Sequence, residues 1–230
     1  MRNKKKISII TFPGSNCDRD LKVAIKECLN IEPKLIWHKE SNIENTDMIL
    51  IPGGFSYGDY LRAGILATKS PAIKEVIRFS KKGIPIIGIC NGFQILTECK
   101  LLPGALIKNK NPKFLCVNTT LKVNNKNKFS KFYKNNQLIE LPIAHSQGNY
   151  VIESSELEDL KNNNQIILQY SDKKGDTGEL NNPNGSTNNI AGITNKKKNI
   201  LGMMPHPERA ITKNKLEDGI FFFKNLSQML

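Results

Sequence analysis

Cys90 stands between two glycines in a pattern typical of a catalytic nucleophile. The apolar run 84–89 precedes it, Gly88 lies two residues before it, and Gly92 lies two residues after it. This is the spacing of a nucleophile elbow, in which a buried strand turns sharply into a helix and larger side chains at the flanking positions would collide. A helix N-terminus beside the sulfur favours the thiolate, so the spacing predicts attack on an acyl group. A buried structural cysteine is the alternative, because free cysteines are among the most buried residues.

A cysteine nucleophile needs a base, and the sequence contains three histidines. His206 follows a short apolar stretch and has Glu208 two residues later to orient its imidazole. His38 also precedes a carboxylate, Glu40, by two residues. In the strand order 2-1-3-4, however, its strand would lie three strands from the elbow, which is about 14 Å and too far for a hydrogen bond. We therefore expect His206 and Glu208 to activate the cysteine, and His145, which has no nearby carboxylate in the sequence, is the remaining competitor.

A pair of glycines follows the third expected strand. Residues 52–64 read P-G-G-F-S-Y-G-D-Y-L-R-A-G. In an open α/β sheet ligands bind beyond the carboxyl ends of the strands, so this loop would lie beside the elbow if the two strands are neighbours. The backbone N–H groups of Gly53 and Gly54, together with that of Asn91, would then form an oxyanion hole. A plain turn before a helix is the alternative for such a pair.

Strands and helices alternate in the first part of the chain and predict the elements that hold these residues. We expect strands at 7–12, 35–38, 48–51 and 84–89, a helix capped by Asn16 or Asp18 and running to about Leu29, and a helix at 71–82. Shorter strands follow at 114–123, 137–142, 165–170, 190–194 and 200–204, before a last helix at 215–230. This order predicts the α/β class, with an open, mostly parallel sheet, helices on both faces and added antiparallel strands in a single domain over 1–230.

Composition limits the other function classes. The net charge is +13, but the lysines are scattered and occur with asparagines, and no basic helix carries interleaved aromatics, so we do not expect a nucleic-acid partner. No apolar run is long enough for a membrane span. The five cysteines form no C-x-x-C pair, so we expect no metal site or disulfide framework and a reducing, cytoplasmic compartment.

Several strings together resemble the class I, or triad, glutamine amidotransferases. They are G-I-C-N-G-F-Q-I-L at the elbow, the glycine-pair loop, and G-M-M-P-H-P-E-R around His206. The strings P-G-S-N-C-D at 13–18, W-H at 37–38 and P-N-G-S at 183–186 are similar to those members of the family that serve purine biosynthesis. The resemblance covers nearly the whole chain and implies a flavodoxin-like fold.

The resemblance also implies a reaction. Cys90 would attack the side-chain amide of L-glutamine, His206 would pass a proton to the leaving ammonia, and Glu208 would hold the imidazole. By the same resemblance, Gln94 and the backbone near 145–148 would help to bind glutamine. The ammonia would pass to a large synthetase subunit that converts formylglycinamide ribonucleotide to its amidine with ATP and Mg²⁺. A small bridging subunit would complete the assembly, and this chain would carry no cofactor of its own.

Two other interpretations stay open at this point. The first is a thiol hydrolase of related architecture that acts alone, such as a γ-glutamyl hydrolase or a relative of the cysteine-elbow peptidases and chaperones. The second is a non-catalytic scaffold or nucleic-acid-binding protein that has kept an enzyme fold.

The asparagine-rich segments 124–136 and 172–189 are expected to be loops whose partner-facing contacts differ from the family pattern.

Overall fold

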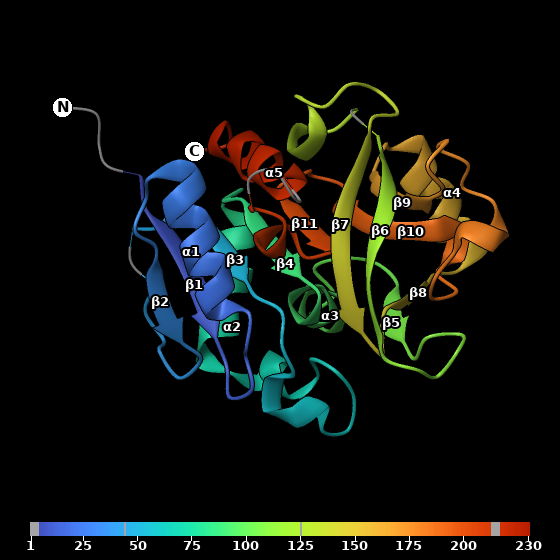
Figure 1. Cartoon of the computed structure of the whole chain (residues 1–230). Coiled ribbons are helices and arrows are strands. Elements are labelled where there is room, and N and C mark those ends of the chain that lie inside the picture. The colour runs from blue at the N-terminus through green and yellow to red at the C-terminus, as the bar shows by residue number, and fades with distance from the viewer. Residues whose placement is uncertain (1–4, 44, 125, 213–216) are drawn as a thin grey trace.

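A mixed nine-stranded sheet runs through the structure, a computed structural model that describes residues 5–43, 45–124, 126–212 and 217–230 (Figure 1). Its parallel half consists, in spatial order, of β2 (Lys34–Trp37), β1 (Ile7–Thr11), β3 (Met48–Ile51), β4 (Ile86–Ile89) and β11 (Ile200–Met203). Its antiparallel half continues with β10 (Ile190–Thr194), β9 (Ile166–Ser171), β6 (Leu115–Val123) and β7 (Leu138–His145). Two further strands, β5 (Ala105–Ile107) and β8 (Asn149–Val151), pair separately. The predicted α/β fold and the predicted order 2-1-3-4 are both confirmed.

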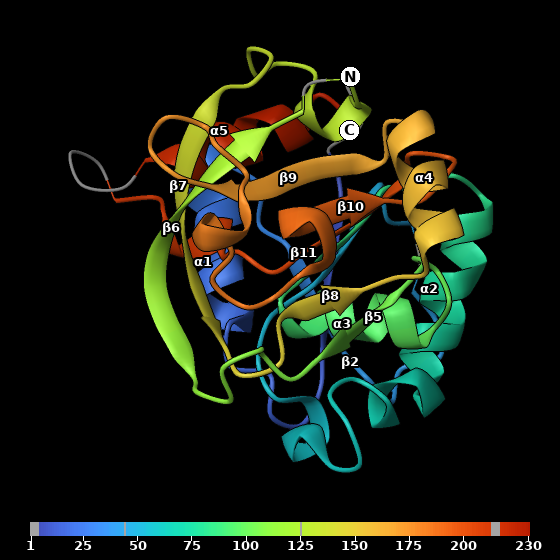
Figure 2. The same ribbon diagram turned by 90° about the vertical axis from the view of Figure 1, so that its right-hand side faces the viewer.

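Helices cover both faces of this sheet, as Figures 1 and 2 show from two directions. The helices α1 (Asp18–Leu29) and α5 (Asp218–Ser227) pack together on one face. The opposite face carries α2 (Pro71–Lys81) and α3 (Asn91–Glu98), with α4 (Ser154–Asn162) beside the antiparallel half. No helix among the described residues has both the length and the apolar character needed to cross a bilayer.

Four of the five parallel strands are almost entirely apolar and buried on both faces, whereas the edge strand β2 buries only Ile36. Every residue of β1, β3, β4 and β11 is buried, as expected for strands that lie between two layers of helices. In α1 the buried residues Leu21, Ala24 and Ile25 recur at the spacing of one helix face. The core therefore lies on both sides of the parallel half, and the loops after its strands gather at one edge.

Four features differ from the sequence-based expectations. The N-cap of α1 is Cys17, and neither Asn16 nor Asp18 caps it. The strand β7 continues through Pro142 to His145, because β7 is an edge strand and an edge tolerates a residue without an N–H group. The short elements β5, β8 and α4 were not predicted; α4 buries only Leu160 and so shows almost no apolar periodicity. The last helix begins at Asp218 rather than 215, and residues 213–216 lie outside the described residues.

The contact between α3 and the end of β3 depends on the absence of a side chain at Gly92. A Cβ atom there would lie 2.1 Å from the carbonyl oxygen of Ile51 and 2.8 Å from its carbonyl carbon. At Gly88 a Cβ would lie 2.5 Å from the carbonyl oxygen of Gly92. These two glycines therefore allow the N-terminus of α3 to lie directly against the two central strands.

We expect Gly92→Ala to lower the free energy of unfolding by about 3 kcal/mol or more, because backbone atoms must move apart to admit the methyl group. Gly83→Ala is the matched control: Gly83 has φ +81°, but a Cβ there meets nothing within 4 Å. Its cost should be about 1 kcal/mol, from backbone strain alone. Urea unfolding of both variants measures the difference, and equal losses would show that the close approach at Gly92 is unimportant.

Candidate active site

Cys90 occupies a strained turn between β4 and α3. Its backbone angles are φ 50° and ψ −105°, in a region that residues with a side chain rarely adopt. The turn is held because the Cys90 N–H donates to the Met203 carbonyl at 2.7 Å, and the Cys90 carbonyl accepts from the N–H groups of Phe93 and Gln94 at 2.9 and 3.1 Å. Backbone strain of this kind is typical of functional sites. The side chain is buried, and its sulfur lies 3.8 Å from the Ala144 carbonyl oxygen.

Three backbone N–H groups beside this turn are free of backbone partners. In the described part of the chain, those of Gly53, Gly54 and Asn91 donate to no backbone carbonyl. Gly53 and Gly54 follow β3, which is the direct neighbour of β4 in the sheet, and Asn91 is the first residue of α3. The glycine pair thus lies next to the elbow, as the sequence analysis expects of an oxyanion hole.

His206 and Glu208 form a buried pair in the turn after β11, the other neighbour of β4. Glu208 Oε1 accepts a hydrogen bond from His206 Nδ1 at 2.6 Å, and the two side chains are 0% and 2% exposed, respectively. The His206 N–H donates to the Pro142 carbonyl at 2.8 Å, so β7 holds this turn in place. The carboxylate assigns the proton to Nδ1 and leaves Nε2 as the nitrogen that could accept one from a thiol.

Burial alone would lower the pKa of His206, but the charge of Glu208 and then that of Cys90 raise this pKa well above its ordinary value. The Cys17 sulfur acts in the same direction. His206 Nε2 is buried and has no hydrogen-bond partner in the described structure, so it is the ring nitrogen that remains available to the Cys90 thiol or to a substrate. A protonated imidazole beside a thiolate is the ion pair that activates cysteine nucleophiles.

Gly53 is the point at which these side chains meet. A Cβ atom on Gly53 would lie 2.7 Å from the His206 Cε1 atom, 3.1 Å from the Cys17 sulfur and 3.4 Å from the Cys90 Cβ atom. Three segments that are far apart in the sequence therefore pack around one backbone position. Any larger residue at Gly53 would push the imidazole away from the elbow.

Cys17 is the site residue that the sequence analysis did not assign. It lies at the N-cap of α1, is 2% exposed, and accepts a hydrogen bond from Arg209 Nη2 at 3.2 Å. Arg209 also donates through Nε to Asp20 Oδ2 at 3.1 Å. The signal available in the sequence was the position of Cys17 after β1, whose neighbour β3 leads into the glycine pair.

Cys17, His206 and Glu208 form a cluster whose potential metal-binding atoms lie within 4.8 Å of one another. Two features of the cluster disfavour a cation there. The Glu208 carboxylate is already hydrogen-bonded to the imidazole, and the Arg209 guanidinium lies 3.2 Å from the Cys17 sulfur. The positive charge of Arg209 repels a metal ion, and the geometry suits an imidazole–carboxylate pair better than a metal centre.

The other two histidines have different surroundings. His145, at the end of β7, lies with its Nδ1 atom 3.2 Å from Asn109 Oδ1 and has no carboxylate partner among the described residues. Burial and then the charge of His206 lower the pKa of His145 to about 4, so its ring is neutral and weakly basic at pH 7. His38 follows β2, two strands beyond β3, and lies 2.7 Å from the Tyr57 hydroxyl. The geometry therefore favours His206 as the base.

Gln94 connects the elbow helix to the turn after β7. Its Nε2 atom donates to the Gln147 carbonyl at 2.7 Å, and its Oε1 atom accepts from Asn91 Nδ2 at 2.8 Å. Asn109 Oδ1 accepts from the Gly148 N–H at 2.9 Å and so fixes the far end of the same turn. The turn 145–148 and Gln94, both expected to bind substrate, thus lie in one connected wall beside Cys90.

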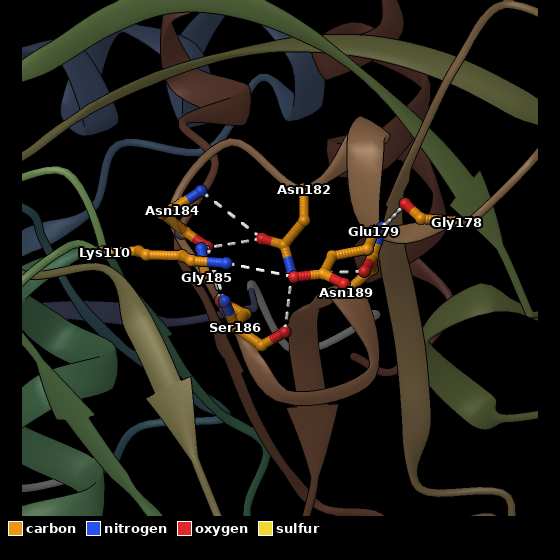
Figure 3. Close-up of polar contacts among 8 residues, drawn as sticks. All are labelled: Lys110, Gly178, Glu179, Asn182, Asn184, Gly185, Ser186 and Asn189. Atoms are coloured by element: carbon orange, nitrogen blue, oxygen red, sulfur yellow. Dashed lines mark hydrogen bonds and ion pairs between the residues drawn. The ribbon is translucent and has the colours of Figure 1, made fainter.

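An asparagine-rich loop, whose internal contacts Figure 3 shows, is hydrogen-bonded to the segment that carries Gly148. Asn184, which is fully buried, donates from Nδ2 to the Gly148 carbonyl at 2.9 Å, and the Ser186 hydroxyl accepts from the Tyr150 N–H at 3.1 Å. Asn182 Oδ1 accepts from the Gly185 N–H at 2.8 Å and closes the turn that Figure 3 shows. The P-N-G-S string at 183–186 is therefore explained by its hydrogen bonds to the segment that carries Gly148.

Comparison with known proteins gives consistent matches over nearly the full length. The family model for the CobB/CobQ-like glutamine amidotransferase domain matches residues 4–218. Phosphoribosylformylglycinamidine synthase subunit PurQ of Pelagibacter ubique is 51% identical over 95% of this chain and 96% of that protein. The PurQ subunit of Zymomonas mobilis is 46% identical over 98% of this chain and 99% of its own. A chain of the PurLQS structure from Thermotoga maritima is 36% identical, with a TM-score of 0.86 and 98% of both chains covered.

We expect iodoacetamide to alkylate Cys90 before the other buried cysteines, because His206 provides an imidazolium beside it. In a Cys116→Ser background, which removes the exposed thiol, mass spectrometry after short exposure at pH 7 should find the label on Cys90. His206→Asn should slow this labelling by about tenfold. Cys99 is the internal reference, since burial raises its pKa to about 12. If Cys17 were labelled faster than Cys90, Cys17 rather than Cys90 would be the activated thiol, and the prediction would be wrong.

The neutral state of buried His145 predicts a loss of stability on acidification. The ordinary histidine pKa is 6.5 and that of His145 in the fold is about 4, so between these values the unfolded chain binds a proton that the folded chain does not. This group should remove up to about 3 kcal/mol of stability as the pH falls from about 6.5 to 4. Urea unfolding of wild type and His145→Asn at pH 7, 5.5 and 4 should show the gap between them closing. A gap independent of pH would contradict the neutral assignment.

Proposed function

Because this chain belongs to the family of CobB/CobQ-like glutamine amidotransferase domains, we infer that it hydrolyses L-glutamine to glutamate and ammonia. It supplies the ammonia to the synthetase subunit of phosphoribosylformylglycinamidine synthase, which forms formylglycinamidine ribonucleotide in purine biosynthesis. The observation that carries this conclusion is the near full-length similarity to PurQ subunits, together with an elbow cysteine beside a buried imidazole–carboxylate pair.

The proposed reaction begins with the Cys90 thiolate, which attacks the side-chain carboxamide carbon of glutamine. The carboxamide oxygen becomes an oxyanion that accepts hydrogen bonds from the backbone N–H groups of Gly53, Gly54 or Asn91. His206 carries a proton on Nε2 when its pKa is raised, and it donates that proton to the leaving nitrogen, which departs as ammonia.

A γ-glutamyl thioester on Cys90 remains after ammonia has left. His206, now neutral, takes a proton from water, and the resulting hydroxide attacks the thioester carbonyl. Collapse of the second tetrahedral intermediate releases glutamate and regenerates the thiolate. Throughout the cycle Glu208 keeps the Nδ1 proton in place at 2.6 Å and stabilises the charged ring.

Exposed apolar side chains in the loop after the glycine pair support the proposal that a partner protein binds beside this site. Phe55, Tyr60 and Leu61 are 41%, 70% and 77% exposed, and all three lie in the loop that begins with the glycine pair. Phe114, which is 52% exposed, lies with its ring centroid 6.5 Å from that of Phe55. Exposed aromatic and aliphatic side chains in one patch are typical of protein interfaces.

The proposal extends to the rest of the assembly. The large synthetase subunit would bind ATP and Mg²⁺, a small subunit would join the complex, and this chain would need neither cofactor nor metal. The proposed compartment is the reducing cytoplasm, in which the Cys90 thiol would stay available for attack.

The test is a glutaminase assay of this chain with and without its synthetase subunit, and with the small subunit where it is present. Cys90→Ala and His206→Ala should each lower ammonia release from glutamine by about 1,000-fold or more. Synthesis driven by added ammonium should survive in both variants, because the synthetase chemistry is untouched. Cys17→Ala is the matched control and should keep activity within about tenfold, since this cysteine makes no bond to substrate in the proposed reaction.

Three results would contradict the proposal. Glutamine hydrolysis retained in Cys90→Ala would exclude this nucleophile. A rate unaffected by the synthetase would favour a hydrolase that acts alone, and salt-sensitive DNA binding without glutaminase activity would favour a scaffold.

A further inference from the structure

Asp59 is a partly buried carboxylate beside the proposed glutamine site. It lies in the loop after β3 and has φ 54°, a conformation that Asp and Asn tolerate better than most residues. Burial raises its pKa to about 6. Its contact with the site is through Asn91, whose Nδ2 atom lies 3.5 Å from Asp59 Oδ1.

The loop is fixed on both sides of this carboxylate. On one side the Ser56 N–H donates to Asn91 Oδ1 at 3.1 Å. On the other side Arg62 forms a two-bond ion pair with Glu98, with both nitrogen–oxygen distances at 2.7 Å. The position of Asp59 relative to the elbow helix is therefore set by contacts that do not involve its own carboxylate.

Asp59 has no cationic partner in the described structure. None of the ion pairs includes it, and no nearby positive charge contributes to its pKa. The nearest arginine in the sequence, Arg62, is already paired with Glu98. A half-buried carboxylate in such a position is costly unless a cation completes it.

The substrate can supply that cation. Asn91 Nδ2 donates to Gln94 Oε1 at 2.8 Å and also points toward Asp59, so two oxygen acceptors flank the residue that directly follows Cys90. When the glutamine carboxamide lies at Cys90, its α-ammonium group is a few bonds away and has three donors to satisfy. Two oxygen acceptors, one of them negatively charged, would bind an ammonium group well. A ligand that carries a hydrogen atom in place of the ammonium group would gain nothing from them.

We propose that Asp59 binds the α-ammonium group of glutamine and makes the site selective for an α-amino acid amide over a simple carboxamide. This inference rests on the proposed glutaminase function and adds the residue that recognises the far end of the substrate. Gln94 Oε1 contributes the second acceptor. Selectivity of this kind is strong because the analogue without the ammonium group leaves a buried carboxylate unpaired.

The test compares L-glutamine with glutaramate, which has the same carboxamide and carboxylate but lacks the α-ammonium group. In the complex with the synthetase subunit, Asp59→Asn should lower kcat/KM for glutamine by about 30-fold or more, mainly through KM. For glutaramate the same substitution should change kcat/KM less than about threefold, because this ligand has no ammonium group to pair with the Asp59 carboxylate. Asn fits the left-handed backbone of Asp59, so thermal unfolding should be nearly unchanged.

A second measurement does not depend on turnover. L-glutamate and glutarate should each protect Cys90 from iodoacetamide, and Asp59→Asn should weaken protection by L-glutamate alone. Glu98→Gln is the matched control, since it loosens the same loop by removing the Arg62 partner while leaving the Asp59 carboxylate in place. Glu98→Gln should change turnover of L-glutamine and glutaramate by the same factor, and it should change protection by L-glutamate and glutarate by the same factor.

The outcomes separate this inference from the function on which it rests. Wild-type complex that hydrolyses no glutamine would contradict the glutaminase function itself. Active wild type in which Asp59→Asn weakens glutamine and glutaramate equally, or leaves both unchanged, would overturn the role of Asp59 and leave the function standing.

Discussion

The site depends on close packing around a residue that has no side chain. Gly53 lies two residues after the end of β3, and the His206 ring, the Cys17 sulfur and the Cys90 Cβ atom all lie within 3.4 Å of the position that its Cβ would occupy. Parallel strands bring their carboxyl ends to one edge, which delivers the loops after β1, β3, β4 and β11 to the same place. The missing side chain then allows the delivered groups to come close enough to interact.

Burial and the nearest charged partner decide which of these groups carries a charge. His206 and His145 are both buried, but they have opposite protonation preferences, because only His206 has a carboxylate 2.6 Å from its ring. The charge of His206 adds to the burial of His145 in keeping that ring neutral. One cationic imidazole therefore lies beside the elbow, and Arg209 donates a hydrogen bond to the second thiol, Cys17.

The two halves of the sheet contribute different parts of the site. The parallel half supplies the proposed nucleophile, base and oxyanion donors from the ends of β3, β4 and β11. The antiparallel half supplies the turn after β7, which Gln94, Asn109 and Asn184 hold by hydrogen bonds to its backbone. The loop with Asp59 contacts the elbow helix through Asn91. A rigid wall of this kind positions a substrate without requiring side chains from the edge strand itself.

The sequence by itself determined the local features. The G-x-C-x-G spacing specified a strand-to-helix turn at Cys90, apolar runs specified the central strands, and the H-x-E spacing paired His206 with Glu208, because each of these depends on residues within a few positions of one another. Only the tertiary structure decided which distant groups share the site. Cys17 and His206, which are 189 residues apart, come together because both pack against Gly53, whose carbonyl accepts a hydrogen bond from the Cys17 N–H at 3.3 Å. Asp59 reaches Asn91 through a loop whose left-handed turns no apolar periodicity encodes. Local spacing fixes local backbone geometry, whereas contacts between distant segments are set by strand order and packing, which a single sequence records only indirectly.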